Sequence, residues 1–223
     1  MNIKEIYNRF DKIGCLTFAT IDNGYPETRI AHFVAYDDEG LYFKTMTSKP
    51  FYRQLKEHNK VSACGLAAST KVEEDENGMP VFEPGYTARV TGDIKEVSFE
   101  EVKQKAKTNE MFVTAVKDIE RYNDMVTFCL YRGKFEIFDY DFELISRENK
   151  VYRETHTFGD FETEFRGVKI DDTCIRCGKC YKVCTFKAVV KTEEGPYEIN
   201  NNRCDVCGSC ILNCPKKSIK AYK

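Results

Sequence analysis

The sequence predicts an α+β protein in two parts, a mostly β N-terminal domain and a small cysteine-rich C-terminal domain. Eight of the eleven cysteines lie between Cys174 and Cys214. Before them, short apolar and β-forming runs alternate with turn signals such as Asp-Asn-Gly at 22–24, which is typical of antiparallel strands. The expected division is a first domain at residues 1–145, a linker at 146–167 and a second domain at 168–223.

Composition places the chain among globular proteins. Its residues are 42% hydrophobic and 31% charged, and no stretch is as long and apolar as a membrane-spanning helix. The first ten residues lack the apolar run of a secretory signal, which predicts a cytoplasmic protein without a membrane partner. From Asp171 onward ten Lys or Arg stand against six Asp or Glu, but thiolate-bound metal would add negative charge there, so we expect no nucleic-acid partner.

The first elements are expected in quick succession. Helical spacing at the N-terminus is followed by three strand-like runs with short turns between them, which predicts a three-stranded meander. The expected bounds are a helix at 2–10 and strands at 15–21, 28–36 and 41–45.

A short helix is expected to begin near Ser48. Ser48 is able to cap it, Pro50 suits its first turn, and Phe51 and Leu55 share one face. Further on, Ser98 and Glu101 form a capping-box pattern before another helix. The remaining expected elements are a buried strand at 61–67, an acidic surface loop at 71–80, a strand at 86–97, a second helix at 109–121 and closing strands at 125–140.

Strands in short steps with helices at the crossovers favour a small antiparallel barrel over a parallel α/β sheet. Neither a GxGxxG motif nor a phosphate-binding P-loop is present, so a dinucleotide-binding domain has no support. Residues 146–169 are charged and irregular in pattern, which predicts a connecting segment.

The clustered cysteines form two copies of one motif, CxxCxxCxxxC, thirty positions apart. Without a secretion signal, metal ligation is favoured over disulfides. Zinc sites usually pair two thiols before a longer gap, so zinc is the weaker alternative. Three thiols at intervals of three suit a loop wrapped around a cubane. The motif residues are Cys174, Cys177, Cys180 and Cys184, then Cys204, Cys207, Cys210 and Cys214.

This arrangement closely resembles the bacterial two-cluster ferredoxins over residues 168–222. In such proteins the fourth cysteine of each motif ligates the other cluster. The resemblance therefore implies one [4Fe-4S] cluster held by Cys174, Cys177, Cys180 and Cys214, and another held by Cys204, Cys207, Cys210 and Cys184. Because so short a segment has few large apolar side chains, bound clusters are also expected to stabilise its fold.

Residues 1–140 resemble the FMN-binding split-barrel family of pyridoxamine 5'-phosphate oxidase-like proteins, including its nitroimidazole-reductase-like branch; residues 25–65 carry the resemblance. It implies bound FMN, with haem and deazaflavin as alternatives found in the same family. A phosphate suits the Ser48-Lys49 helix start because free backbone N–H groups and the helix dipole favour anions. The implied cofactor contacts are Arg29, Ile30, Ala31, His32, Phe33, Lys44, Thr45, Ser48, Lys49 and, from a partner subunit, Phe138.

The two resemblances together predict a flavin and iron-sulfur oxidoreductase. An external carrier protein, two [4Fe-4S] clusters and FMN would relay electrons to a small organic substrate of the nitroaromatic or quinone class. A pyridoxamine phosphate oxidase activity is disfavoured, because oxygen turnover would endanger the clusters; an anaerobe's reductase is expected. The alternative is a non-enzymatic electron carrier or redox sensor. The resemblance also implies a homodimer.

No residue is assigned as a catalytic acid or base. The three histidines show no metal-binding spacing, so an ordinary structural or surface role is expected for each. Cys15, Cys64 and Cys129 lie in apolar, strand-like runs and are expected to be buried in the packing.

Overall fold

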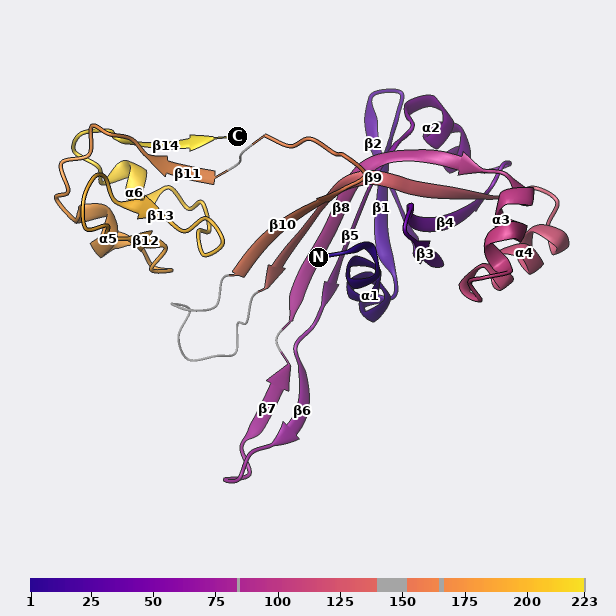
Figure 1. The fold of residues 1–223 in the computed structure, drawn as a ribbon, viewed down its shortest axis with the longest axis horizontal. Helices are drawn as coiled ribbons and strands as arrows, with labels where there is room; N and C mark the ends of the chain where they lie inside the picture. The colour runs from indigo at the N-terminus through magenta and orange to yellow at the C-terminus, as the bar shows by residue number, and fades with distance from the viewer. Residues whose placement is uncertain (84, 140–151, 165–166, 223) are drawn as a thin grey trace. The chain divides into compact units, whose positions relative to one another are not determined.

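The structure is a computed structural model that describes every residue except 84, 140–151, 165–166 and 223. An eight-stranded sheet, ordered β2-β1-β5-β8-β9-β4-β3 with β10 paired to β9, forms the framework of the N-terminal part (Figure 1). The strands are β1 (Leu16–Asp22), β2 (Tyr25–Ala31), β3 (Ala35–Asp37), β4 (Gly40–Met46), β5 (Lys60–Ala67), β8 (Tyr86–Val97), β9 (Met125–Asp139) and β10 (Tyr152–Phe158). The expected α+β class is confirmed.

The expected meander is wrong. Strand β1 pairs with β2 and β5, whereas β3 pairs with β4 and β4 pairs with β9, each pairing antiparallel. The run expected as one strand at 28–36 is broken between Ala31 and Ala35, and its two pieces lie at opposite ends of the strand order. The turn signals predicted the order of the strands along the chain. Which strands pair depends instead on which apolar faces are buried together.

Aromatic rings fill the inner side of the sheet. The Phe18 ring lies 5.1 Å from Phe33 and 5.2 Å from Phe43, measured between centroids. Phe43 also stacks on Phe128 at 5.7 Å and on Phe51 at 6.0 Å. All five rings are buried, so the strands and the following helix are held by one aromatic core.

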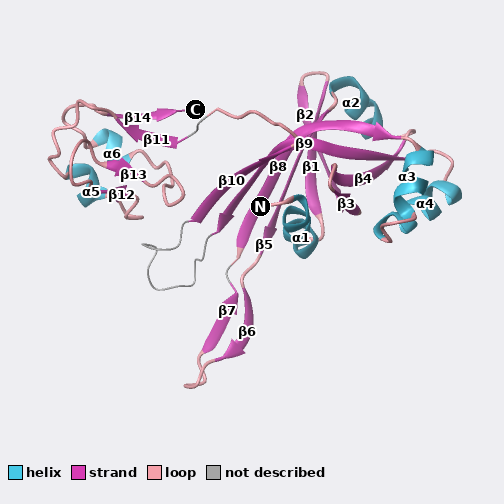
Figure 2. Cartoon of the chain, viewed as in Figure 1, coloured by secondary structure: helices cyan, strands magenta, loops and turns pink. Residues whose placement is uncertain are grey.

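Helices accompany this sheet (Figure 2). In the first, Asn2 and Glu5 form a reciprocal capping box. Ser98 caps another by accepting a bond from the Glu101 backbone N–H. The helices are α1 (Ile3–Ile13), α2 (Pro50–His58), α3 (Phe99–Ala106) and α4 (Met111–Arg121).

Helices α3 and α4 cover the opposite face of β4 and β9. Val102 and Phe112 pack there against Tyr42 and Cys129, which are directly opposite each other in the β4–β9 register. Lys105 of α3 binds Asp37 with a 2.8 Å ion pair and so attaches this helix to the β3–β4 turn.

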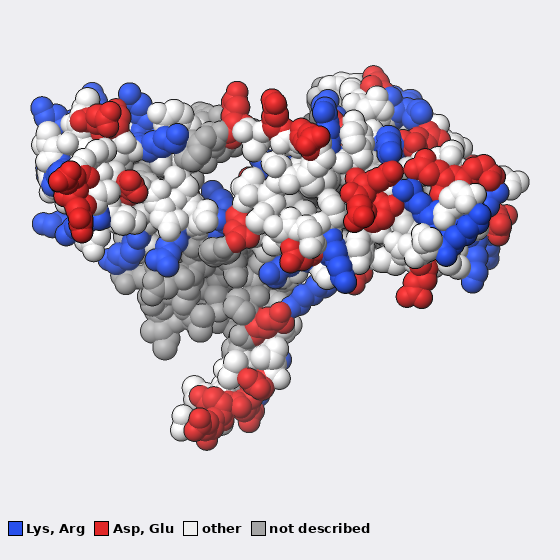
Figure 3. Space-filling model, viewed as in Figure 1, with Lys and Arg blue, Asp and Glu red and all other residues white. Residues whose placement is uncertain are grey.

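Two expectations about irregular segments are corrected. Residues 71–80 lie largely within a hairpin made of β6 (Thr70–Glu74) and β7 (Pro80–Glu83), and only its turn is irregular. Acidic side chains gather at the hairpin tip (Figure 3). The connecting segment contains β10 and the start of β11. Pairing of β10 with β9 satisfies its backbone hydrogen-bonding groups, although the sequence of the segment is charged. The predicted boundary at residue 145 lies outside the described residues.

The C-terminal part has its own small core. Val168, Ala188, Val189, Tyr197 and Ile219 are buried there together with cysteine side chains. Its elements are β11 (Gly167–Ile170), α5 (Lys179–Val183), β12 (Val189–Val190), β13 (Glu198–Ile199), α6 (Ser209–Leu212) and β14 (Ile219–Tyr222). β11 pairs with β14, and β12 pairs with β13. No helix among the described residues is long and apolar enough to cross a membrane.

Candidate metal and cofactor sites

The two cysteine motifs adopt the same backbone path. Arg176 and Val206, each at the second position between the first two cysteines of its motif, both have φ of +55°. Gly178 and Gly208, at φ +74° and +79°, then precede α5 and α6. A glycine suits that left-handed position because it has no Cβ to clash. The third cysteine of each motif, Cys180 or Cys210, lies in the following helix.

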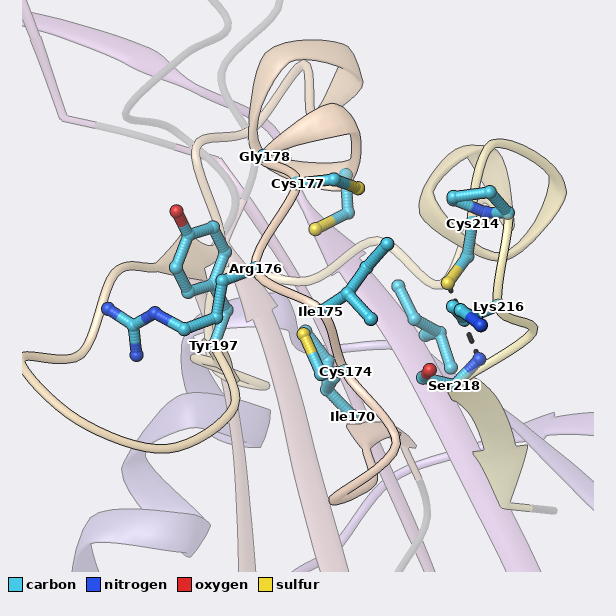
Figure 4. Close-up of a pocket in the computed structure, with 13 residues that line it drawn as sticks. Ile170, Cys174, Ile175, Arg176, Cys177, Gly178, Tyr197, Cys214, Lys216 and Ser218 are labelled. Carbon is cyan, nitrogen blue, oxygen red and sulfur yellow. Dashed lines mark hydrogen bonds between the residues drawn. The ribbon is translucent and has the colours of Figure 1, made fainter.

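One cavity is lined by Cys174, Cys177 and Cys180 of the first motif and by Cys214 of the second, with an empty volume of about 330 Å³ (Figure 4). We call it the first cavity. Figure 4 shows the Cys214 sulfur on the side across from Cys174 and Cys177. The fourth cysteine thus joins the other motif, which is the crossing that the ferredoxin resemblance implies.

A second cavity repeats the arrangement. Cys204, Cys207 and Cys210 line it together with Cys184 of the first motif, around an empty volume of about 370 Å³. The rest of its lining is mostly apolar and includes the Phe186 ring and aliphatic side chains such as Val189 and Ile199. Each cavity is therefore lined by four thiols, three from one motif and one from the other.

The donor set fits a [4Fe-4S] cubane. A cubane binds each thiolate through a different iron, so its four ligands surround a volume and do not converge on one point. Among the described residues, no three His, Cys, Asp or Glu side chains converge on a single metal ion. All eleven cysteines are free thiols.

Backbone N–H groups already point at three of these sulfurs. Ala188 N lies 3.2 Å from the Cys184 Sγ, and Ser218 N lies 3.4 Å from the Cys214 Sγ. The Cys204 Sγ accepts from Val206 N at 3.4 Å. Such donors stabilise sulfur-centred negative charge and influence cluster potential.

Burial raises the pKa of three of these thiols. It raises the pKa of Cys210 to about 11, with the Cys204 charge acting in the same direction. Desolvation is also the largest cause of the raised pKa of Cys180 and of Cys204. Iron binding to these residues must therefore displace protons.

The remaining cysteines only partly meet expectation. Cys129 is buried as predicted, but Cys15 and Cys64 are exposed. The register explains Cys64: it lies opposite Thr17, on the face of β1 and β5 that does not carry the aromatic core. Apolar sequence context alone did not identify which face would be covered.

In the N-terminal part, Arg29 lies on β2 beside helix α2. Its guanidinium donates to Thr20 Oγ1 and, at 2.9 Å, to Gln54 Oε1, and its Cζ lies 4.3 Å from the Phe51 ring centroid. Burial lowers the pKa of Arg29, against the raising effects of Glu27 and Asp22. A predicted contact residue is therefore attached directly to the helix whose N-terminus was predicted to face a phosphate.

Sequence reasoning missed a group of polar side chains beside Arg29, which are Thr20, Asp22, Arg53 and Gln54. Gln54 accepts from Thr20 at 2.6 Å and donates to Asp22 at 2.9 Å, while Arg53 holds the same carboxylate at 2.7 Å. Hydrogen bonds from Arg53 and Gln54 lower the pKa of Asp22. The available signal was Gln54 itself, a polar residue on the apolar face that Phe51 and Leu55 define.

Helix α2 begins differently from expectation. Its N-cap is Lys49, which makes no side-chain capping bond, and Pro50 occupies the first helical position. Ser48 donates instead to Asp124 Oδ2 at 2.9 Å, so the expected Ser48 cap is wrong. Lys49 is exposed at this uncapped end.

Lys44 and Thr45 point to opposite faces of β4 because neighbouring strand residues alternate. Lys44 forms an ion pair with Asp118 of α4. Thr45 is buried on the side of the aromatic core. The structure thus brings Thr45, but not the Lys44 ammonium, to the face on which Arg29 and Phe18 lie.

The other predicted contacts lie along the end of β2 and on β9. Ile30 and His32 are exposed, Ala31 is half-buried and Phe33 lies in the aromatic core. Phe138 is half-buried on β9, and the Arg153 guanidinium carbon lies 5.2 Å from its ring centroid. These placements leave the cofactor role of each residue a prediction.

Comparison with known proteins identifies both parts. Residues 3–136, more than half of the chain, match the family model described as pyridoxamine 5'-phosphate oxidase. The chain belongs to the pyridoxamine 5'-phosphate oxidase family. Residues 173–219 match a 4Fe-4S dicluster domain, so this family member carries an iron-sulfur domain at its C-terminal side. Both predicted resemblances, and the split-barrel fold class, are confirmed.

Curated relatives match the pyridoxamine 5'-phosphate oxidase family member only in part. A polyferredoxin-like subunit of an aliphatic sulfonate oxidoreductase from Pyrococcus furiosus is 30% identical over 76 residues, 33% of this chain and 43% of that protein. The pyruvate synthase subunit PorD of Methanocaldococcus jannaschii is 31% identical over 55 residues, 25% of this chain and 64% of that protein. The chain thus spans less than two thirds of either relative.

A solved structure of a NimC/NimA family protein from Clostridium acetobutylicum has a TM-score of 0.46 at 17% identity, and the match covers 70% of this family member and 91% of that chain.

Proposed function

We propose that this chain is a flavin and iron-sulfur oxidoreductase. Electrons pass between an external carrier protein, two [4Fe-4S] clusters and FMN, and reduce a small organic substrate of the nitroaromatic or quinone class. The observation that carries the proposal is the pair of cavities, each surrounded by four thiols, in a chain that also belongs to the pyridoxamine 5'-phosphate oxidase family. The domain limits 1–145 and 168–223, with a linker between them, are part of this proposal.

In the proposal, each cavity holds one cluster. The first is bound by Cys174, Cys177, Cys180 and Cys214, and the second by Cys204, Cys207, Cys210 and Cys184. The clusters supply one-electron transfer. The linings of both cavities are largely apolar, and the neighbouring backbone N–H groups stabilise the negative charge of the thiolates.

FMN is proposed at the start of helix α2. Arg29 contacts this helix through Phe51 and Gln54, and the uncapped helix start carries the exposed Lys49. A phosphate group would gain from these two cations and from the backbone N–H groups of the first turn. Ile30 to Phe33, Lys44, Thr45 and Ser48 complete the proposed contacts, and Phe138 would contribute from a partner subunit.

A homodimer is proposed because large apolar side chains are exposed on one face of the sheet. The register places Ile21, Ile30 and Leu66 on the same face of β1, β2 and β5, with exposed fractions of 43%, 68% and 53%. A second copy of the chain is the occupant that the family resemblance favours. Burial of this face would stabilise the pair.

The proposed reaction balances with two electrons. Two reduced one-electron carrier proteins supply them, and a quinone takes both with two protons and leaves as the hydroquinone. FMN, when bound, exchanges electrons singly with one partner and in pairs with another. Turnover of oxygen is disfavoured because it would damage the clusters, so an anaerobic reductase is proposed instead of a pyridoxamine phosphate oxidase.

An electron carrier without its own substrate is the second candidate. It is favoured by the curated relatives, whose names describe subunits of larger oxidoreductases. In that case the reduced chain would pass its electrons to another protein and would not turn over a small acceptor.

Anaerobic purification followed by cofactor analysis tests the proposal. Iron, sulfide and released flavin are quantified per chain, and the flavin is identified by mass. The protein is then mixed with a reduced ferredoxin and a quinone or a nitroaromatic compound. Bound FMN, two clusters per chain and steady turnover support the reductase. Fast cluster oxidation by a carrier protein without turnover supports the second candidate, and zinc in place of iron contradicts both.

A further inference from the structure

Arg176 binds a loop that is distant from it in the sequence. Strands β12 and β13 are joined by residues 191–197, which have no regular secondary structure. The Arg176 guanidinium donates to the carbonyl oxygen of Thr192 at 2.5 Å, to that of Glu193 at 3.2 Å and to that of Gly195. One planar side chain thus satisfies three carbonyl groups of this loop, which we call the 191–197 loop.

Thr192 also forms hydrogen bonds with Arg176 and within the loop. Thr192 Oγ1 accepts from Arg176 at 3.1 Å and donates to the carbonyl oxygen of Pro196 at 2.9 Å. Hydrogen bonds from a charged donor are stronger than neutral ones, and a guanidinium has the forked shape needed to reach several acceptors. Arg176 therefore attaches the loop to the first cysteine motif by hydrogen bonds, and Lys191 adds a cation–π contact 4.5 Å from the Tyr181 ring centroid.

The loop ends in Tyr197, which forms part of the wall of the first cavity. Tyr197 is buried, lines that cavity and has its ring centroid 5.2 Å from the Arg176 Cζ. Figure 4 shows the Arg176 side chain extending away from Cys174 and Cys177, alongside Tyr197. Its charged end contacts the loop and not the sulfurs.

The second motif has the same backbone but not the same side chain. Val206 stands thirty positions after Arg176 with the same φ of +55°, lines the second cavity and is 42% exposed. The valine side chain has no group that forms a hydrogen bond to a loop. The two cavities therefore differ at one matched position.

We infer that Arg176 is a positioning residue that closes one wall of the first cavity by holding the 191–197 loop and Tyr197 against it, and that Val206 makes no such contact at the matched position of the second cavity. This inference rests on the proposed function in one respect, the occupation of both cavities by clusters. It implies that loss of the Arg176 side chain lets a chelator or an oxidant reach the first cluster sooner and leaves access to the second cluster unchanged.

The test compares the accessibility of the two clusters in the full-length holoprotein. Anaerobically purified protein is treated with a water-soluble ferrous-iron chelator and with iodoacetamide, and alkylated cysteines are mapped by mass spectrometry over time. In the wild type, the labelling rates of Cys174 and Cys177 set the reference for the first cavity, and those of Cys204 and Cys207 set it for the second. In Arg176→Val, labelling of Cys174 and Cys177 should become about tenfold faster, because the exposed population rises as the loop opens. Labelling of Cys204 and Cys207 should not change.

Three variants distinguish the positioning role of the Arg176 side chain from the effect of its charge. Arg176→Lys keeps the charge but not the fork, so it should behave like Arg176→Val. Val206→Ala, at the matched position, should leave the labelling of Cys174 and Cys177 unchanged. Tyr197→Phe keeps the ring and should change that rate less than twofold. If Arg176→Lys restores the wild-type rate, or if Arg176→Val accelerates both groups equally or neither, the inference is wrong.

The iron content of each protein shows whether a negative result rejects this inference alone or also rejects the proposed clusters. A variant purified with about half of the wild-type iron and with Cys174 and Cys177 already reactive supports the inference, whereas a variant that has lost both clusters contradicts it. Wild-type protein without iron would reject the proposed clusters and this inference together. Wild-type protein with both clusters and an unaffected Arg176→Val variant would reject this inference alone.

Discussion

Cys174 and Cys214 line the same cavity, although Cys174 opens the first cysteine motif and Cys214 closes the second. This pairing joins the two motifs into one structural unit. It also means that loss of one thiol should affect the cluster of the other motif, which gives the first prediction.

Cys214→Ala should remove the first cluster and spare the second. The iron content should fall from about eight to about four atoms per chain, because each cubane holds four. Cys174, Cys177 and Cys180 should then react with iodoacetamide, while Cys204, Cys207 and Cys210 stay protected.

Cys184→Ala is the matched control and should produce the opposite labelling pattern, since Cys184 lines the second cavity. Labelling of Cys204, Cys207 and Cys210 in the Cys214→Ala variant would mean that the ligands do not cross between the motifs.

Arg29→Ala and Lys49→Ala should lower flavin occupancy without changing the iron content. Each change removes a charge-assisted contact to the proposed phosphate, and such a contact is worth about 1.5–3 kcal/mol, or roughly a tenfold or greater loss of affinity. Equilibrium dialysis against FMN, followed by absorbance, measures the effect.

Lys56→Ala serves as the control for these two variants. Lys56 lies on the same helix but pairs with Glu96 at 3.0 Å, away from the helix start. It should leave FMN affinity unchanged. Normal FMN affinity in both Arg29→Ala and Lys49→Ala would show that the phosphate site is elsewhere.

Gly92→Ala should destabilise the sheet by about 1–3 kcal/mol, the usual cost of overpacking. A Cβ at Gly92 would lie 2.1 Å from the backbone oxygen of Arg132 and 2.7 Å from the Cα of Gly133. Neither backbone atom is able to rotate aside, so β8 and β9 would have to separate.

Thermal unfolding followed by circular dichroism measures this cost. Thr91→Ala is the neighbouring control, because it loses only an exposed hydrogen bond with Ser62 and should cost about 1 kcal/mol or less. A Gly92→Ala variant as stable as the wild type would show that the two strands separate at little cost.

Cys129 should resist alkylation at pH 8 in the native protein, whereas Cys15 and Cys64 react. Cys129 is buried against Tyr42, and burial raises its pKa to about 12 from an ordinary value of 9. Peptide mapping after iodoacetamide treatment measures the three residues separately.

The same shift makes stability depend on pH. Because the folded state holds the Cys129 proton more tightly than the unfolded state, its contribution is complete below about pH 9 and is lost as the pH rises toward 12. Cys129→Ala should remove that part of the alkaline decline in the unfolding midpoint. Rapid alkylation of Cys129 at pH 8 would contradict the burial that underlies both expectations.

The sequence determined the iron-sulfur unit because its information is local. Two copies of the same cysteine spacing, with Gly178 and Gly208 at the left-handed positions before each short helix, dictate the same loop twice. The bounds of α1, β8 and α4 were predicted within a few residues for a similar reason: apolar periodicity and caps act between near neighbours.

Only the tertiary structure decided relations between distant residues. Strand alternation sends Lys44 to Asp118 and Thr45 to the opposite face, and sequence spacing alone does not show which face is covered. The same limit applies to the pairing of β4 with β9, to Arg29 on Gln54 and to Arg176 on the 191–197 loop. Each depends on which surfaces pack together, because burial and hydrogen-bond satisfaction are properties of the assembled chain and not of any one segment.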